Sequence, residues 1–152
     1  MPFNTKYPPL NFQFVVDFEN QEFSLDKGFQ SVTGLCVKLN DQDNHQEMVS
    51  VFDNLILKRA YEPNSKLVEW CMKAINHKNF IAENLQVKLL NSDHKLLSAW
   101  SVEQAIPVGW GVDELNAQEG KILMETIELK YKLFQVLNSK GNIIAPIHRT
   151  RS

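Results

Sequence analysis

The sequence has few cysteines and glycines and no cluster of either. Its two cysteines, Cys36 and Cys71, show no CxxC or Cys/His spacing, which excludes the common zinc patterns and a disulfide scaffold. We expect both thiols to be reduced, as in a cytoplasm. The six glycines form no phosphate-binding loop, because Gly109 and Gly111 do not open a helical pattern.

Basic residues and long apolar runs are also missing. The formal net charge is -2 and Lys and Arg are spread along the chain, so the basic stripe of a nucleic-acid-binding protein is absent. No apolar run approaches the roughly 18 to 20 residues that cross a bilayer. The first residues lack the basic and apolar regions of an export signal. We therefore expect a soluble protein without a signal peptide or a direct membrane anchor.

What the sequence does contain is the composition of a folded domain. Hydrophobic residues make up 43% and charged residues 22% of the 152 residues, a mixture typical of globular proteins. This length predicts a single domain, residues 1–152, with a core of its own. Pro2, Pro8 and Pro9 predict an extended N-terminal arm over residues 1–10.

Most of the chain shows the two-residue period of β-strands. In the first strand pattern, Phe12, Phe14 and Val16 alternate with other residues and should form a buried face. Gly34 predicts a bulge or a close approach of two backbones in the second strand region. Further patterns predict a turn, a short strand and a turn at 19–28, a strand at 54–60, and an antiparallel hairpin with arms at 84–90 and 96–102.

The longest strand pattern covers residues 121–134. Leu123, Ile127 and Leu129 share one face and are expected in the core, whereas Glu128, Lys130 and Lys132 on the other face should be exposed. Glu125 falls on the apolar face. Because an unpaired buried carboxylate has a large desolvation cost, we expect Glu125 to pair with Lys or Arg or to lie in a subunit contact.

One segment, at about residues 64–76, follows the helical period instead. Its apolar stripe consists of Leu67, Trp70, Cys71, Ala74 and Ile75, and Asn64 or Ser65 is placed to cap it. A helix of about three turns is not stable alone in water, so the stripe should dock on the strands. The predicted fold class is mainly β (α+β), a small antiparallel β-barrel or two-sheet sandwich with one flanking α-helix.

The polar residues 40–47 are the best candidate for a metal site. Potential ligands alternate there, namely Asp41, Asp43, His45 and Glu47. However, Gln46 and Phe52 stand where a calcium loop needs a glycine and a bidentate carboxylate. On a strand these alternate acids simply make one face soluble, so we expect no metal.

Catalytic groups are equally hard to find. Asp93 and His94 adjoin on a turn and no nucleophile motif accompanies them. Glu125 could act as an acid only with a second convergent carboxylate, which the sequence does not indicate. We expect neither catalytic residues nor a cofactor, and a role in binding or assembly.

The order of several segments resembles a known family. The segments are "YPPLNFQFVVDF", "FQSVTGL", "NLILKRA", a helix with Trp70, "LQVKLLNSDHKLLSAWSVEQAIPVGW" and "DELNAQEGKILMETIELKY". Together they resemble the tail-tube proteins of contractile phage tails and related contractile injection systems over about residues 7–134. The resemblance implies a tail-tube-like fold that assembles as a homo-hexameric ring, with rings stacked into the inner tube.

The same resemblance implies partners and a location. The partners would be copies of the chain itself, adjacent tube rings, the sheath and baseplate or spike hub proteins, with cargo in the lumen as a further option. The protein would be made in the bacterial cytoplasm and assembled into a phage-tail-like particle. Glu128, Lys130 and Lys132 would face the lumen or solvent.

The chain departs from this family in three places. The hairpin between Gly34 and the strand at 54–60 is shorter than usual, Ile106 replaces an aromatic residue, and residues 135–152 extend beyond the usual end. We interpret the polar stretch as the tip of a reduced ring-to-ring hairpin, formed by Asn40, Asp41, Asp43, Asn44, His45 and Glu47.

A short hairpin favours a ring at one end of the tube, either the baseplate-side initiator or the distal end. Three alternatives remain open. They are a subunit of the main tube, a secreted type VI ring protein that carries effectors, and a small ligand- or flavin-binding β-barrel.

Overall fold

The computed structural model describes residues 12–41 and 47–148. The predicted arm at 1–10 and three residues of the predicted hairpin tip, Asp43, Asn44 and His45, lie outside these ranges. The elements, in chain order, are β1 (Gln13–Phe18), η1 (Gln21–Phe23, a 3-10 helix), β2 (Phe29–Thr33), β3 (Val37–Asp41), β4 (Met48–Phe52), β5 (Leu55–Ala60), α1 (Lys66–His77), β6 (Glu83–Leu90), β7 (Leu96–Val112), β8 (Met124–Lys130) and β9 (Leu133–Leu137).

The strands form one large antiparallel sheet and a separate hairpin. The order in the large sheet is β1-β6-β7-β8-β5-β2, with β9 also paired to β7, and β3 pairs with β4 alone. The predicted fold class, mainly β with one helix, is confirmed. Its barrel alternative is not, because β1 and β2 end an open path within the described residues. No helix in the described ranges is long and apolar enough to span a membrane.

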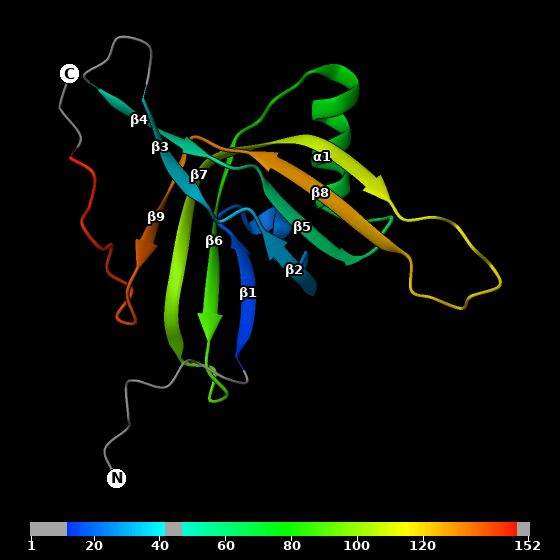
Figure 1. Ribbon diagram of the computed structural model, residues 1–152. Helices are drawn as coiled ribbons and strands as arrows, with labels where there is room; N and C mark the ends of the chain where they lie inside the picture. Colours follow the sequence, from blue (N-terminus) through cyan, green and yellow to red (C-terminus); the bar gives the residue numbers. More distant parts are fainter. Residues whose placement is uncertain (1–11, 42–46, 149–152) are drawn as a thin grey trace.

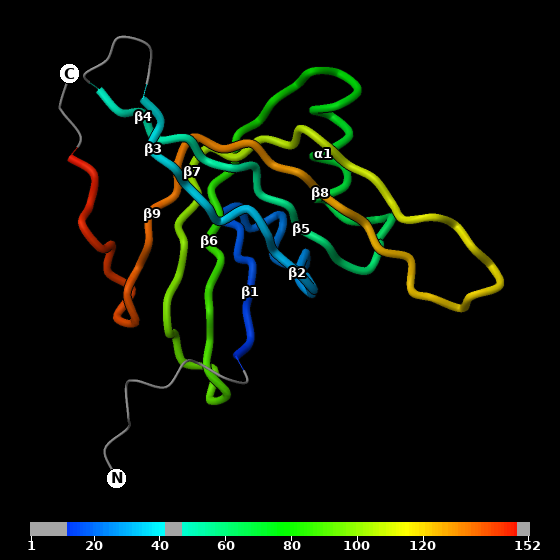
Figure 2. Tube along the Cα trace, viewed as in Figure 1, coloured from blue at the N-terminus to red at the C-terminus, as the bar shows by residue number. Residues whose placement is uncertain are grey.

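The large sheet folds into two layers, and strand β7 runs from one layer into the other. Its first part pairs with β6 and β9, and its last part, from Ile106 onward, pairs with β8. The change occurs beside Gln104, which has a φ of 59° and whose backbone N–H donates to Asn84 Oδ1 at 2.9 Å. A bulge of this kind bends a strand. Figures 1 and 2 show the result, with β1, β6 and β9 running across the direction of β2, β5 and β8.

The core fills the space between the layers and α1 covers one part of it. The helix begins after Ser65, whose side chain accepts a hydrogen bond from Val68 N at 3.0 Å and so caps the first turn. Within the predicted stripe, Leu67, Trp70, Cys71 and Ala74 are buried and Ile75 is half-buried. The Trp70 ring lies against Phe18 and Phe23, which docks the helix on β1 and η1.

Two expectations about the N-terminal region are wrong. Phe12, expected on the buried face, precedes β1 and is 54% exposed. The expected short strand within residues 19–28 is the 3-10 helix η1. The side chain of Asn20 accepts from Glu22 N at 3.0 Å, and this local cap favours a helical turn over an extended chain.

The predicted single strand at 121–134 is also wrong, because it is two strands, β8 and β9. Both pair with the same edge of β7, and the break at Tyr131 and Lys132 lies opposite the bend at Gln104. Lys132 N donates to Glu103 O at 2.9 Å at the start of the second strand. A partner strand must break where β7 bends, so Lys132 does not share a strand with Glu128 and Lys130.

Candidate assembly surfaces

The β3-β4 hairpin projects from the rest of the fold as a two-stranded sheet (Figure 1). In its register Val37 faces Phe52, Leu39 faces Ser50 and Asp41 faces Met48. Since directly opposed residues share a face, Val37, Leu39 and Met48 lie on one side of the hairpin. Val49 and Val51 lie on the other.

These apolar side chains are exposed on both faces of the hairpin. Leu39 is 61% exposed and Met48 57%, and the three valines 37, 49 and 51 are also exposed. An isolated two-stranded hairpin is marginally stable in water. Contiguous exposed apolar residues on a monomer mark a surface that a partner covers. The hairpin therefore has the composition of an interface.

The base of the hairpin is fixed to the core. The Phe52 ring lies 5.8 Å from the Tyr131 ring and 5.1 Å from the Phe134 ring, centroid to centroid. Gly34 has a φ of +98°, and a Cβ placed on it would lie 1.9 Å from Asn54 O. Only glycine fits such an approach. This is the close backbone contact that the sequence predicts at Gly34, and it sets the direction in which the hairpin leaves the sheet.

The described residues of the polar tip are all exposed. Asn40 and Asp41 end β3, and Glu47 precedes β4. Contact between this tip and another ring stays a prediction. Sequence reasoning placed the interface at the polar tip and missed the apolar residues of the two arms, although the alternation of Val37 and Leu39 was a signal for them.

A second exposed apolar site lies on the loop between β7 and β8, residues 113–123. Leu115 is 77% exposed and Ile122 69% exposed. Figure 1 shows this loop extending away from both layers. A hydrogen bond from Asp113 N to Met124 O, 3.0 Å long, closes its base. Like the hairpin, this loop presents apolar side chains that the rest of the described chain leaves exposed.

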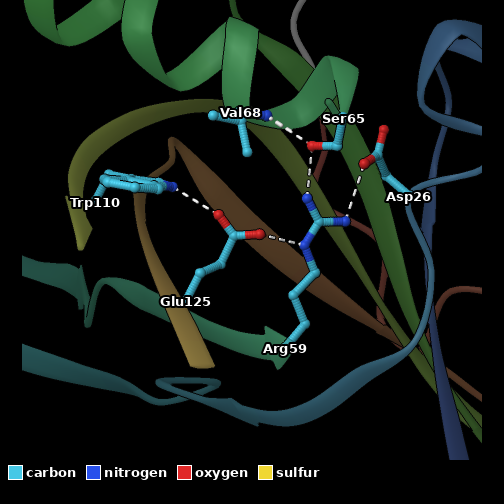
Figure 3. Close-up of polar contacts among 6 residues, drawn as sticks. All are labelled: Asp26, Arg59, Ser65, Val68, Trp110 and Glu125. Atoms are coloured by element: carbon cyan, nitrogen blue, oxygen red, sulfur yellow. Dashed lines mark hydrogen bonds and ion pairs between the residues drawn. The ribbon is translucent and has the colours of Figure 1, made fainter. Parts of the chain in front are cut away.

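Glu125 is buried and ion-paired, and Figure 3 shows the network around it. Arg59 donates through Nε to Glu125 Oε1 at 2.5 Å and through Nη1 to Asp26 Oδ1 at 2.9 Å. Its Nη2 donates to Ser65 Oγ at 2.7 Å. Trp110 Nε1 donates to the second oxygen of Glu125 at 2.7 Å. One guanidinium thus joins β5, β8, the loop before β2 and the cap of α1.

Arg59 stays positively charged in this network, and the buried thiol near it is not reactive. Burial by itself lowers the pKa of Arg59, but the hydrogen bonds to Glu125 and Asp26 outweigh it, and the pKa of Arg59 is raised. Burial raises the pKa of the nearby Cys71 thiol to about 12, so the thiol is protonated at neutral pH and unreactive. The network is suited to holding the elements together.

Sequence reasoning found Glu125 but not its partners. Arg59 follows Leu55 and Leu57 at alternate positions on the buried face of β5, and this period was the signal for it. Asp26 comes from a loop and Trp110 from the distant end of β7, so no local pattern links either of them to Glu125.

The face of β8 opposite the core carries Glu128 and Lys130. Glu128 is half-buried and accepts from Asn54 Nδ2 at 2.7 Å, while Lys130 is exposed. Lys132 is exposed as well, beyond the end of β8. The position of these side chains relative to a lumen stays a prediction.

A sequence profile of the T4-like virus tail tube protein gp19 family matches residues 10–135. The chain belongs to this family. A search of curated proteins gives no significant match.

Several solved structures contain chains with the same fold. A chain of the anti-feeding prophage tube-terminating cap has a TM-score of 0.69 and 17% identity over 91% of this chain and 96% of that one. A chain of the PVC sheath-tube complex, from an extracellular contractile injection system, has a TM-score of 0.66 and 19% identity over 88% and 94%. Hcp1 from Flavobacterium johnsoniae has a TM-score of 0.59 and 13% identity over 86% of this chain and 97% of that one.

Proposed function

We propose that this chain is a structural subunit of the inner tube of a contractile injection system or phage tail, in which it forms a hexameric ring. The observation that carries the proposal is the exposure of apolar side chains on both faces of the β3-β4 hairpin. Burying them in a neighbouring ring would remove this apolar area from water. A closed ring would in addition pair the edge strands that an isolated subunit leaves open.

The hairpin length supports a finer proposal, a ring at one end of the tube. Each arm has five residues. A short hairpin reaches a shorter distance into the next ring and suits a specialised neighbour, such as a baseplate or spike hub protein. The partners are then further copies of the chain, an adjoining ring and the sheath, and the particle assembles in the bacterial cytoplasm.

The outer face of β8 fits the wall of the lumen. Lys130 and Lys132 are exposed, and Glu128 is held in place by Asn54. Polar and charged side chains keep such a wall wet, as they do in the interior of wide water-filled barrels. Cargo carried in the lumen would meet these side chains.

Mass photometry and negative-stain microscopy of the purified chain, over a range of concentrations, test the proposal. Hexameric rings that do not stack would support the tube-end role. Rings that grow into tubes would make the chain a main tube subunit. A monomer at all concentrations would contradict the proposed homo-hexamer, and a bound chromophore in that monomer would favour a flavin-binding barrel.

Deleting residues 40–47 tests the hairpin separately. We expect a folded subunit that no longer associates with an adjoining ring, since the core lies outside the deletion. Asp93→Ser, a change in the exposed turn between β6 and β7, is the control and should leave association unchanged. Association at the wild-type level after the deletion would contradict the role of the hairpin.

A further inference from the structure

The chain continues past β9 into a segment that turns back on it, residues 138–147, which we call the strap. Its turn is well formed. The side chain of Asn138 accepts from the backbone N–H groups of Lys140 and Asn142, each at 3.0 Å, and Asn138 N donates to Asn142 O at 2.9 Å. Gly141 has the positive φ, +81°, that such a turn requires.

The strap lies along the edge of β9 that faces away from β7. Ile143 is opposite Leu137, and Ile144 N donates to Val136 O at 2.8 Å. Ile147 N donates to the side chain of Gln135 at 3.0 Å. Because β9 pairs with β7 through its other edge, the strap covers an edge that would otherwise be open to another strand.

Beyond Ile144 the strap no longer pairs with β9 as a regular strand. Ala145 has a φ of +48°, a left-handed conformation that costs a non-glycine residue energy, and Pro146 has no N–H to donate. The ladder with β9 therefore cannot extend beyond Ile144 in the regular way. Ile143, Ile144 and Ile147 are 38%, 54% and 48% exposed, so the strap gains little from apolar burial.

We propose that the strap is a displaceable cover of the β9 edge, and that an edge strand of a second copy of this chain replaces it during assembly. This inference rests on the proposed ring. An open strand edge is recognised by extended backbone, and β1 and β2, the ends of the sheet path in the described residues, are such edges on every copy. The family profile ends at residue 135, so the strap lies outside the part of the fold that the family shares.

The position of β9 supports a second copy as the occupant. Phe134 of β9 packs on Phe52 of β4, at the base of the hairpin, with ring centroids 5.1 Å apart. A neighbouring copy that paired with β9 would therefore also reach the exposed apolar residues of the hairpin.

A reversible disulfide between the strap and β9 tests the proposal. Leu137 and Ile143 face each other as a non-hydrogen-bonded antiparallel pair, whose Cβ separation suits a disulfide. We would introduce Leu137→Cys with Ile143→Cys in a Cys36→Ser background and compare the oxidised with the reduced protein by mass photometry. We expect the oxidised protein to need at least about tenfold more protein to assemble, because the disulfide holds the strap on β9 and the pairing of β9 with another copy is lost. Equal assembly in both states would overturn the proposal.

A chain that ends at Ser139 provides the second test. Without the strap the edge of β9 is open, and assembly should begin at about tenfold lower concentration than for the full chain. Weaker assembly would also overturn the proposal, because it would make the strap a part of the contact. If the full chain forms rings and neither change alters their assembly, only the proposal about the strap is refuted. If every form of the protein stays monomeric, the proposed ring is refuted as well.

Discussion

The Arg59 network and the β3-β4 hairpin are two exceptions to the usual rule that charged residues are exposed and apolar residues are buried. The network places two carboxylates and a guanidinium in the interior, where Arg59 is 1% and Glu125 0% exposed. The hairpin places leucine, methionine and valine side chains in solvent. Charged groups are almost never fully buried unless paired, and large exposed apolar patches are rare in monomers.

The difference lies in which region is complete within one subunit. Arg59 bonds Glu125, Asp26 and Ser65, and the second Glu125 oxygen bonds Trp110, so the subunit supplies the partners itself. Within the described residues, the apolar side chains of the hairpin arms are left exposed. The network therefore accounts for a fold that is held together from within, and the exposed hairpin supports the proposed association.

Replacing Arg59 should have the largest effect on the subunit. Arg59→Met leaves two buried carboxylates without their cation, and we expect a loss of about 3 to 5 kcal/mol in the free energy of unfolding, measured by denaturant titration. Lys88→Met, which breaks the exposed ion pair with Asp17, is the control and should cost less than about 1 kcal/mol. Equal losses in the two variants would show that burial of the network does not matter.

Gly34→Ala should have the next largest effect, because it acts where the hairpin joins the core. The added Cβ would meet Asn54 O, and alanine does not tolerate the φ of +98°. We expect a loss of about 2 to 3 kcal/mol in the free energy of unfolding. Gly111→Ala, where the Cβ meets open space, is the matched control and should be much milder.

High pH should destabilise the fold, because two acidic groups in its interior have raised pKa values. Burial raises the pKa of Cys71 from 9.0 to about 12, and burial and then the Asp53 charge raise the pKa of Tyr131 from 10.0 to about 12. The unfolded chain therefore loses these protons at lower pH than the folded one. The stabilisation is full below pH 9 and is lost as the pH rises toward 12.

We expect Cys71 to contribute a loss of about 1 to 2 kcal/mol between about pH 9 and 11, measured as the difference in urea unfolding. Cys71→Ala removes the titrating thiol and should flatten this part of the pH dependence. An unchanged slope in the variant would show that the buried thiol is not its source.

Polar changes on the hairpin should have the smallest effect on the subunit and a clear effect on association. Leu39 is exposed, so Leu39→Ser should change the free energy of unfolding by less than about 0.5 kcal/mol. The same variant should associate less, because it removes apolar area from the proposed interface. Lys38→Ser, on the adjacent exposed position of β3, controls for a change in strand propensity. A large loss of stability with normal association would contradict the claim that the hairpin serves association and not the stability of the fold.

Features that depend on a few neighbouring residues could be predicted from the sequence. The period of Leu67, Trp70, Cys71 and Ala74 predicts helix α1, and Gly34 predicts a close approach, because both depend on a few neighbouring residues. The buried charge of Glu125 followed in the same way from its place between Leu123 and Ile127. These features could be predicted without knowing what packs against them.

Features that depend on distant strands could not be predicted. The break between β8 and β9 follows from the bend of β7 at Gln104, which the pattern of residues 121–134 does not contain. Phe12 has the alternation of a buried residue but lies beyond the ladder with β6. Alternation likewise predicts that β3 and β4 have two faces, but not that both faces are left uncovered.

Hydrogen-deuterium exchange of the assembled and the dissociated protein tests the central claim most directly. If the hairpin is the assembly surface and the network is complete within the subunit, amides of β3 and β4 should become strongly protected on assembly, while those around Arg59 and Glu125 should be equally protected in both states. Unchanged exchange in the hairpin, with new protection elsewhere, would contradict the account.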